Sequence, residues 1–165
     1  MKRQKNTPLI IAAGICVLCI LFMCVALNAD RQEVGSFTPP PFAADAKIGT
    51  PQVPDDLGWS LLDAKVYRVG ICGEVQICSG GADLWLTNPE GNNVWMKLRV
   101  LDGKGTVLAE TGLIRPGEYL QWVEFTQTPS PGEKISLKIM AYEPETYFSA
   151  GSVVLNTVAA EGGAQ

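Results

Sequence analysis

The sequence predicts an all-β domain, an antiparallel β-sandwich of about seven strands, preceded by one N-terminal transmembrane helix and a proline-rich stalk. Three observations lead to this prediction. Residues 9–27 carry no charged side chain. After residue 63, short segments of alternating apolar and polar residues recur between clusters of turn-forming residues. No stretch beyond the apolar run shows helical periodicity over about eleven residues, so the domain is expected to consist of strands.

The apolar run at residues 9–27 is long enough to cross a membrane as a helix. At about 1.5 Å per residue it spans roughly 28 Å, close to the thickness of the hydrocarbon layer. It is preceded by three basic residues, Lys2, Arg3 and Lys5. The positive-inside rule therefore places residues 1–8 in the cytosol and the rest of the chain outside the cell membrane. Two alternatives stay open: a signal peptide ending at Ala29, and lipoprotein processing at Cys24.

Charge and proline content both change after the apolar run. The residues beyond position 29 include 17 acids and 10 bases, a net charge of −7. Such an acidic exterior argues against nucleic acid as a partner. Residues 28–62 contain five prolines and few large apolar side chains, which is typical of an extended, semi-rigid stalk outside the membrane.

The strands of the predicted domain, residues 63–158, follow from their alternation and from the turns between them. In the turns at 88–91 and 115–118 proline presets φ and glycine accepts positive φ, and Asp102–Gly105 is expected to be a hairpin loop. The predicted strands are Ala64–Val69, Glu74–Cys78, Ala82–Thr87, Asn93–Leu101, Val107–Glu110, Tyr119–Phe125, Lys134–Tyr142 and Ser152–Val158. Residues 159–165 are expected to be a disordered tail.

Two strands, Asn93–Leu101 and Lys134–Tyr142, separate clearly into two faces. Alternate residues are apolar and are expected in the core: Val94, Met96, Leu98, Val100, Ile135, Leu137, Ile139 and Ala141. The opposite, outer face carries Trp95, Lys97, Arg99, Lys138 and Tyr142. Exposed aromatic residues with polar borders are typical of a surface that contacts a protein or a glycan. Trp95, Lys97 and Tyr142 are therefore the candidate contact residues.

The outer face has an alternative interpretation. The stalk, or residues Trp59–Leu62, could fold over this face and bury Trp95. In that case Trp95 is structural, and the loop at Glu143–Ser149 is the next candidate for a contact surface.

Nothing in the sequence indicates catalysis. The chain has no histidine and so lacks the usual proton shuttle. The carboxylate pairs Asp55–Asp56 and Glu143–Glu145 are expected in solvated loops, and no cluster of oxygen ligands suits a metal ion. We therefore expect no enzyme activity, no metal and no cofactor.

Two cysteines, Cys72 and Cys78, fall in the predicted domain. In one continuous strand they would be about 20 Å apart, which is too far for a bond. A disulfide between them therefore requires the chain to fold back at Gly73, in a compartment where a disulfide can persist. Two reduced cysteines are the alternative.

Three segments within residues 82–141 carry a resemblance. They are a turn with asparagine before a central strand (Asn88 and Asn93–Lys97), an Asp-x-x-Gly hairpin (Asp102–Gly105) and a Pro-Gly-Glu turn before a later strand (Leu113–Glu118). This region resembles the immunoglobulin-like modules of bacterial cell-surface proteins, and the whole chain is similar to small single-pass membrane proteins of Gram-positive anaerobes. The resemblance implies an immunoglobulin-like sandwich at the cell surface and brings no catalytic residues.

Location, fold and outer face together predict a noncatalytic, membrane-anchored surface module with an extracytoplasmic domain. On the first hypothesis the domain makes contacts with a protein partner, for example as a subunit of an envelope assembly. On the second it is a carbohydrate-binding adhesin that uses the aromatic residues of the outer face. The expected partners are the membrane and either a protein or a glycan.

Overall fold

A computed structural model of the chain describes residues 16–19, 22–23 and 37–162. The predicted transmembrane segment, residues 9–27, lies mostly outside the described residues; those at 16–19 and 22–23 are helical. In this described part, no helix is long and apolar enough to span a bilayer. The chain separates into two compact units, Met1–Thr38 and Pro39–Gln165. The second unit contains all the strands that the structure describes.

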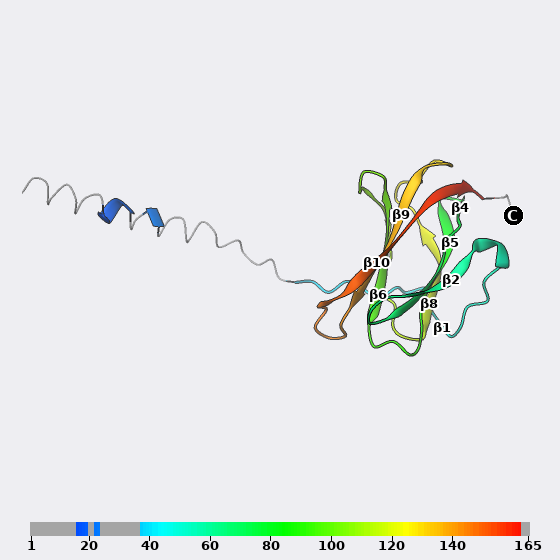
Figure 1. Cartoon of the computed structure of the whole chain (residues 1–165), viewed down its shortest axis with the longest axis horizontal. Helices are drawn as coiled ribbons and strands as arrows, with labels where there is room; N and C mark the ends of the chain where they lie inside the picture. Colours follow the sequence, from blue (N-terminus) through cyan, green and yellow to red (C-terminus); the bar gives the residue numbers. More distant parts are fainter. Residues whose placement is uncertain (1–15, 20–21, 24–36, 163–165) are drawn as a thin grey trace, which may run out of the picture. The chain divides into compact units, whose positions relative to one another are not determined.

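The second unit is all-β, as predicted (Figure 1). A single turn of 3-10 helix, η1, covers Asp55–Leu57. The ten strands are β1 (Lys47–Ile48), β2 (Trp59–Asp63), β3 (Arg68–Cys72), β4 (Val75–Cys78), β5 (Gly81–Asn88), β6 (Trp95–Asp102), β7 (Val107–Glu110), β8 (Glu118–Glu124), β9 (Lys134–Tyr142) and β10 (Ser149–Glu161).

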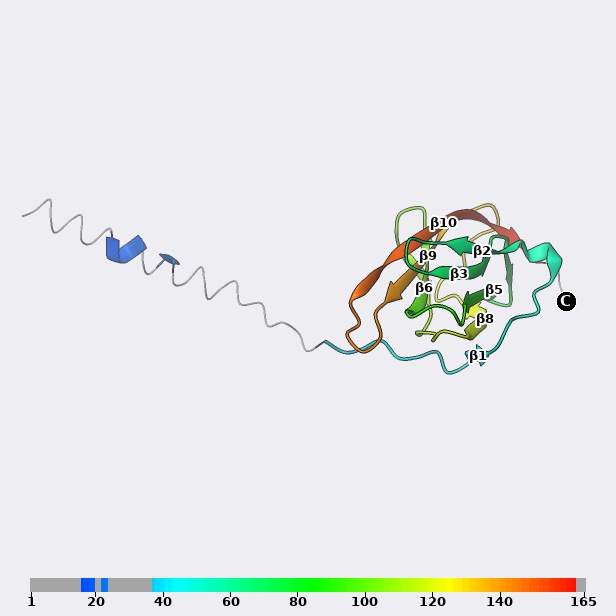
Figure 2. The ribbon, with the colours of Figure 1, turned by 60° about the horizontal axis from the view of Figure 1, so that its bottom comes forward.

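The strands form one curled sheet with the order β1-β8-β5-β4-β10-β9-β6-β7, and β2 and β3 branch from β5. The long strand β10 joins the two halves of the curl (Figures 1 and 2). Residues 149–158 of β10 pair antiparallel with β9, whereas residues 159–161 pair parallel with β4. The sheet therefore folds over on itself and encloses the core between its halves.

The core consists of the inward-facing residues of both halves. Every apolar position expected to be buried in β9, in β6 and directly before β6 is buried: Val94, Met96, Leu98, Val100, Ile135, Leu137, Ile139 and Ala141. Ala82, Leu84 and Leu86 of β5 face them from the other half. The prediction of the core is therefore confirmed, and with it the phase of the strands, since a shift by one residue would exchange the two faces.

A second, smaller apolar cluster lies on the outside of β5. The register of β5 against β8 shifts between Asp83 and Leu86, and Trp85 has a φ of 48°. This irregularity places Trp85 with Leu57 and Cys72, where it stacks on Tyr119 with ring centroids 5.9 Å apart. Leu57 belongs to the predicted stalk, so part of that segment covers the sheet.

The compact unit extends beyond the predicted limits of residues 63–158 at both ends. The segment expected to be a stalk, residues 28–62, contains β1, η1 and β2. The expected disordered tail begins inside β10, where Ala159 is buried; residues 163–165 lie outside the described residues. The prolines of residues 28–62 favour a solvated segment. The few apolar side chains between them instead pack on the sheet, because tertiary contacts can override a local preference.

Candidate contact site

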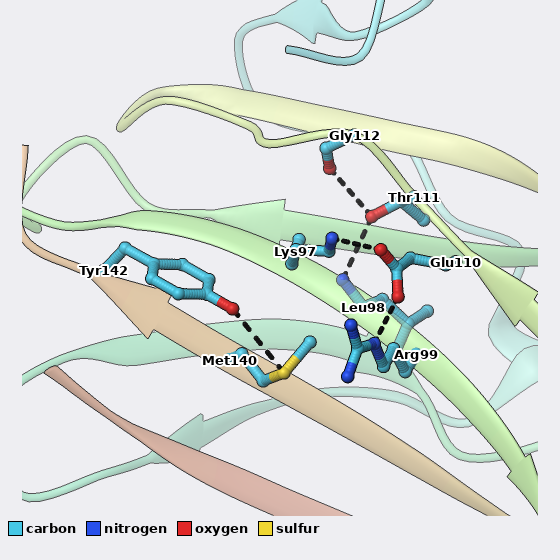
Figure 3. Close-up of polar contacts among 8 residues, drawn as sticks. All are labelled: Lys97, Leu98, Arg99, Glu110, Thr111, Gly112, Met140 and Tyr142. Carbon is cyan, nitrogen blue, oxygen red and sulfur yellow. Dashed lines mark hydrogen bonds and ion pairs between the residues drawn. The ribbon is translucent and has the colours of Figure 1, made fainter. Parts of the chain in front are cut away.

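The outer face of β6 and β9 is the place where the candidate contact residues lie. Across the antiparallel pair, Trp95 is directly opposite Tyr142, and Lys97 is opposite Met140. The Tyr142 hydroxyl donates to the Met140 sulfur at 3.7 Å (Figure 3). Trp95 and Tyr142 therefore share one face, because residues directly opposite each other in a sheet point to the same side.

Trp95 is half-buried because two other aromatic rings contact it. The ring of Phe42 meets it edge-on at a centroid distance of 4.9 Å, and the ring of Tyr147 does so at 5.2 Å. Edge-to-face contacts at these distances are favourable. These three residues, Phe42, Trp95 and Tyr147, are called the aromatic cluster here. Phe42 comes from the predicted stalk, so the alternative in which the stalk covers Trp95 holds in part.

Phe42 is held on the sheet by the strap, which we define as residues Pro41–Ala43. The Leu113 amide donates to the Pro41 carbonyl, and the Ala43 amide donates to the Leu113 carbonyl, both at 2.9 Å. The guanidinium of Arg115 lies 3.6 Å from the centre of the Phe42 ring, a cation–π contact. The strap therefore has both backbone and side-chain anchors.

Lys97 is not an exposed border of the face, contrary to the prediction. It is only 5 % exposed, and its ammonium group pairs with Glu110 of β7 (Figure 3). The same carboxylate accepts a hydrogen bond from Arg99, whose side chain is 41 % exposed. The alternation of β6 correctly predicts the side on which Lys97 lies. The partner that buries it comes from another strand and cannot be read from that alternation.

The charge of Glu110 is stabilised by this arrangement. Partial burial would by itself raise the pKa of the Glu110 carboxyl, but the hydrogen bonds from Arg99 and Lys97 outweigh it and lower the pKa below the ordinary value. The ion triad Lys97–Glu110–Arg99 is therefore a fixed structural feature of the face. We assign it no contact role of its own.

The loop between β9 and β10, residues 143–148, positions the third ring of the aromatic cluster. The Glu143 amide donates to the Phe148 carbonyl at 2.8 Å, and the Tyr147 amide to the Glu143 carbonyl at 3.0 Å. Glu145 and Tyr147 have φ values of 66° and 57°, a left-handed conformation that is uncommon for residues other than glycine. The loop is thus held in a strained form, and Phe148 at its end is 70 % exposed.

Phe148 is the contact candidate that pattern analysis did not single out. The sequence does carry a signal, since a Glu-Pro-Glu-Thr turn precedes two aromatic residues in the loop Glu143–Ser149, which is the alternative contact surface. What the sequence does not provide is the proximity of this loop to Trp95, whose ring Tyr147 contacts.

The two domain cysteines are both free and lie in different surroundings. Cys72 is buried at the end of β3, and Cys78 is exposed at the end of β4. Burial, reinforced by the nearby carboxylates of Asp83 and Asp56, raises the pKa of the Cys72 thiol to about 12. The chain does turn between the two strands at Gly73, as a disulfide would require, but the structure forms no bond between them. A thiol of this pKa is a poor nucleophile near neutral pH.

Within residues 37–162, no group of three or more histidine, cysteine, aspartate or glutamate side chains could hold a metal ion. The acidic pairs Asp55–Asp56 and Glu143–Glu145 are exposed. Comparisons of the chain with protein-family models, with curated proteins and with solved structures find no match. The function therefore has to be inferred from the residues of this chain.

Proposed function

We propose that this protein is a noncatalytic binding module, anchored in the cell membrane by residues 9–27, whose extracytoplasmic domain contacts a protein partner in an envelope assembly. The uncharged apolar run and the basic residues before it support the anchor and its orientation. The acidic balance of the remaining chain disfavours nucleic acid as the partner.

An immunoglobulin-like sandwich is the finer description of the fold that we propose. In that fold, strands A, B, E and D form one sheet and strands C, F and G the other. The order β3-β5-β8-β1 resembles the first set, with β1 in the place of strand D although it comes earlier in the chain. The order β6-β9-β10 resembles the second set. The parallel pairing of β4 with β10 bridges the two.

The observation that carries the proposed contact is the exposed Phe148 beside the aromatic cluster. Large aromatic side chains are enriched at the centres of protein interfaces, and Phe148 lies next to further aromatic residues rather than alone. The loop that presents Phe148 keeps Glu145 and Tyr147 in left-handed conformations, each costing of order 1–3 kcal/mol. A loop held in a strained form is pre-organised, which reduces the entropy lost on binding.

Carbohydrate binding is the second candidate, and the pairing of Trp95 with Tyr142 on one face favours it. A sugar ring, however, stacks on the open face of an aromatic side chain. Phe42 and Tyr147 already contact the Trp95 ring, and this leaves less of it available. A protein contact centred on Phe148 uses the same end of the domain without displacing either ring.

A photoreactive amino acid placed at position 148 tests the protein contact in cells. We expect a discrete crosslinked product with a second protein. The matched control is Val66, which is 63 % exposed on another loop and should give none. Phe148→Ala should leave the thermal midpoint within a few degrees, since exposed side chains contribute little to stability. The same products at both positions, or none at either, would contradict the proposal. Quenching of the tryptophan fluorescence by glycans, to the same extent in the original chain and in Phe148→Ala, would favour the adhesin.

A further inference from the structure

One edge of β10 has no strand beside it in the described part of the chain. Residues 149–158 pair with β9 on one side only, and the pairing with β4 on the other side is confined to residues 159–161. The Thr157 hydroxyl donates to the carbonyl of Gly73, just before β4, at 2.8 Å. This contact marks the end of the stretch in which the segment around β4 lies beside β10. Residues 152–156 form the open edge.

The hydrogen bonds at the end of β10 show which backbone groups face this edge. Ala159 exchanges bonds with Gly132 and Glu133 just before β9, and the Gly162 amide donates to Ile77 of β4 on the opposite side. Backbone groups of successive residues in a strand point to opposite edges. The register of β10 with β9 is regular from Ser152 onward. The N–H and C=O groups of three residues therefore point to the open edge: Ser152, Val154 and Asn156.

This edge lacks the features that usually protect a strand from pairing with another chain. Protected edges carry charged residues or proline, or are very short or covered. Residues 149–158 contain no charge and no proline, and Val154 and Val158 are about half exposed.

The other edge strands of the domain are protected. The strand β1 has only two residues, β2 carries Asp63 paired with Arg68, and the Leu108 carbonyl of β7 accepts hydrogen bonds from Thr126 and Gln127. Among the strands that the structure describes, only β10 has a long, uncharged stretch, residues 149–158, with an open edge.

We propose that this edge binds a second copy of the chain, with the two β10 strands antiparallel about a twofold axis at Val154. A strand that fits must have a free edge and should place no charge opposite Val154, and residues 152–156 of β10 meet both conditions. In the paired state Val154 lies opposite Val154 of the second copy, and Ser152 lies opposite Asn156. Each of these pairs exchanges two backbone hydrogen bonds. No like charges face each other, and the two exposed Val154 side chains pack against each other.

The twofold register is tested by a crosslink in the full chain, purified in a neutral detergent. Directly opposite residues that exchange hydrogen bonds have Cα atoms about 5.5 Å apart, a distance that a disulfide spans. In a Cys78→Ser background, Val154→Cys should therefore form a covalent dimer under mild oxidation. Val107→Cys, at a valine of similar exposure on β7, should form no more dimer than the background chain. The Cys78→Ser chain without a further cysteine is the control, because any covalent dimer that it forms comes from its remaining cysteines, such as those of the apolar run.

Self-association without a crosslink is the second measurement. The full chain should show a monomer–dimer equilibrium in sedimentation experiments over a concentration series. Val154→Lys adds the kind of charge that protects natural edges and should raise the dissociation constant at least tenfold, whereas Val107→Lys should leave it unchanged. A chain that stays monomeric at every concentration, or equal effects of the two lysines, would overturn the proposal. The contact through Phe148 is independent of this result.

Discussion

Glu110 binds two cations at once, the buried Lys97 and the partly exposed Arg99. Because these hydrogen bonds hold the pKa of Glu110 below its ordinary value of 4.5, the folded state favours the charged carboxylate more than the unfolded state does. Glu110 therefore contributes stability above pH 4.5, and this contribution is lost as the pH falls through the lowered folded-state pKa. Burial alone would have the opposite sign, so the two cations decide the direction.

Glu110 and Lys97, the two members of the buried ion pair, should respond differently to mutation. Glu110→Gln leaves the Lys97 ammonium buried without an anion and should cost about 1–3 kcal/mol of unfolding free energy at pH 7. Lys97→Met replaces the buried charge with an apolar chain of similar length, while Glu110 keeps Arg99, and should cost less than about 1 kcal/mol. Urea unfolding at pH 7 measures both. Glu110→Gln should also flatten the loss of stability below pH 4.5. A greater cost for Lys97→Met would show that the pair is not arranged as described.

At the scale of elements, the strap depends on the absence of a side chain at Gly112. A Cβ atom at this position would lie 2.5 Å from the Ala43 amide nitrogen and 2.8 Å from the Ala43 Cα, and backbone atoms cannot move aside as a flexible side chain can. Gly112→Ala should displace the strap, cost about 1–3 kcal/mol in urea unfolding, and speed trypsin cleavage after the exposed Lys47. Gly91→Ala is the control, since nothing lies within 4 Å of that position. Equal behaviour of the two variants would mean that the strap is not seated against Gly112.

The elements that the sequence predicts well are those with a period of two. In β6 and β9 the alternation determines which side chains are buried and also that Trp95 and Tyr142 share a face. The strap and η1 have no such pattern. Phe42 and Leu57 are isolated apolar residues among prolines, and only their contacts with Trp95 and Trp85 explain their burial. Those contacts join residues far apart in the chain, which a local pattern does not encode.

For the whole molecule, residues 39–62 belong to the fold of the second unit, and this can be tested by truncation. A segment of residues 63–158 lacks the strap, the cover over Trp85 and the pairing of 159–161 with β4. Losses of several kcal/mol lower the thermal midpoint of a domain of this size by more than about 10 °C. We expect circular dichroism to show that difference, or no cooperative transition at all, relative to a segment of residues 39–162. Equal midpoints would show that the N-terminal segment only lies against the sheet.

The orientation of the chain in the membrane gives the last prediction. We expect an amine reagent that does not cross membranes to modify Lys65 and Lys134 on intact cells, because both are exposed on the domain that the positive-inside rule places outside. Lys2 and Lys5 should react only after the cells are permeabilised. Lys97 is an internal control, because its burial and its pairing with Glu110 should protect it until the domain is unfolded in urea. If Lys134 reacts only after permeabilisation, the domain is cytosolic, and a contact with envelope proteins is excluded. If Lys97 reacts as fast as Lys134, the domain has unfolded and the labelling does not report its orientation. Protection of Lys97 shows that the labelled domain is folded, and the accessibility of Lys134 then determines the side of the membrane on which it lies.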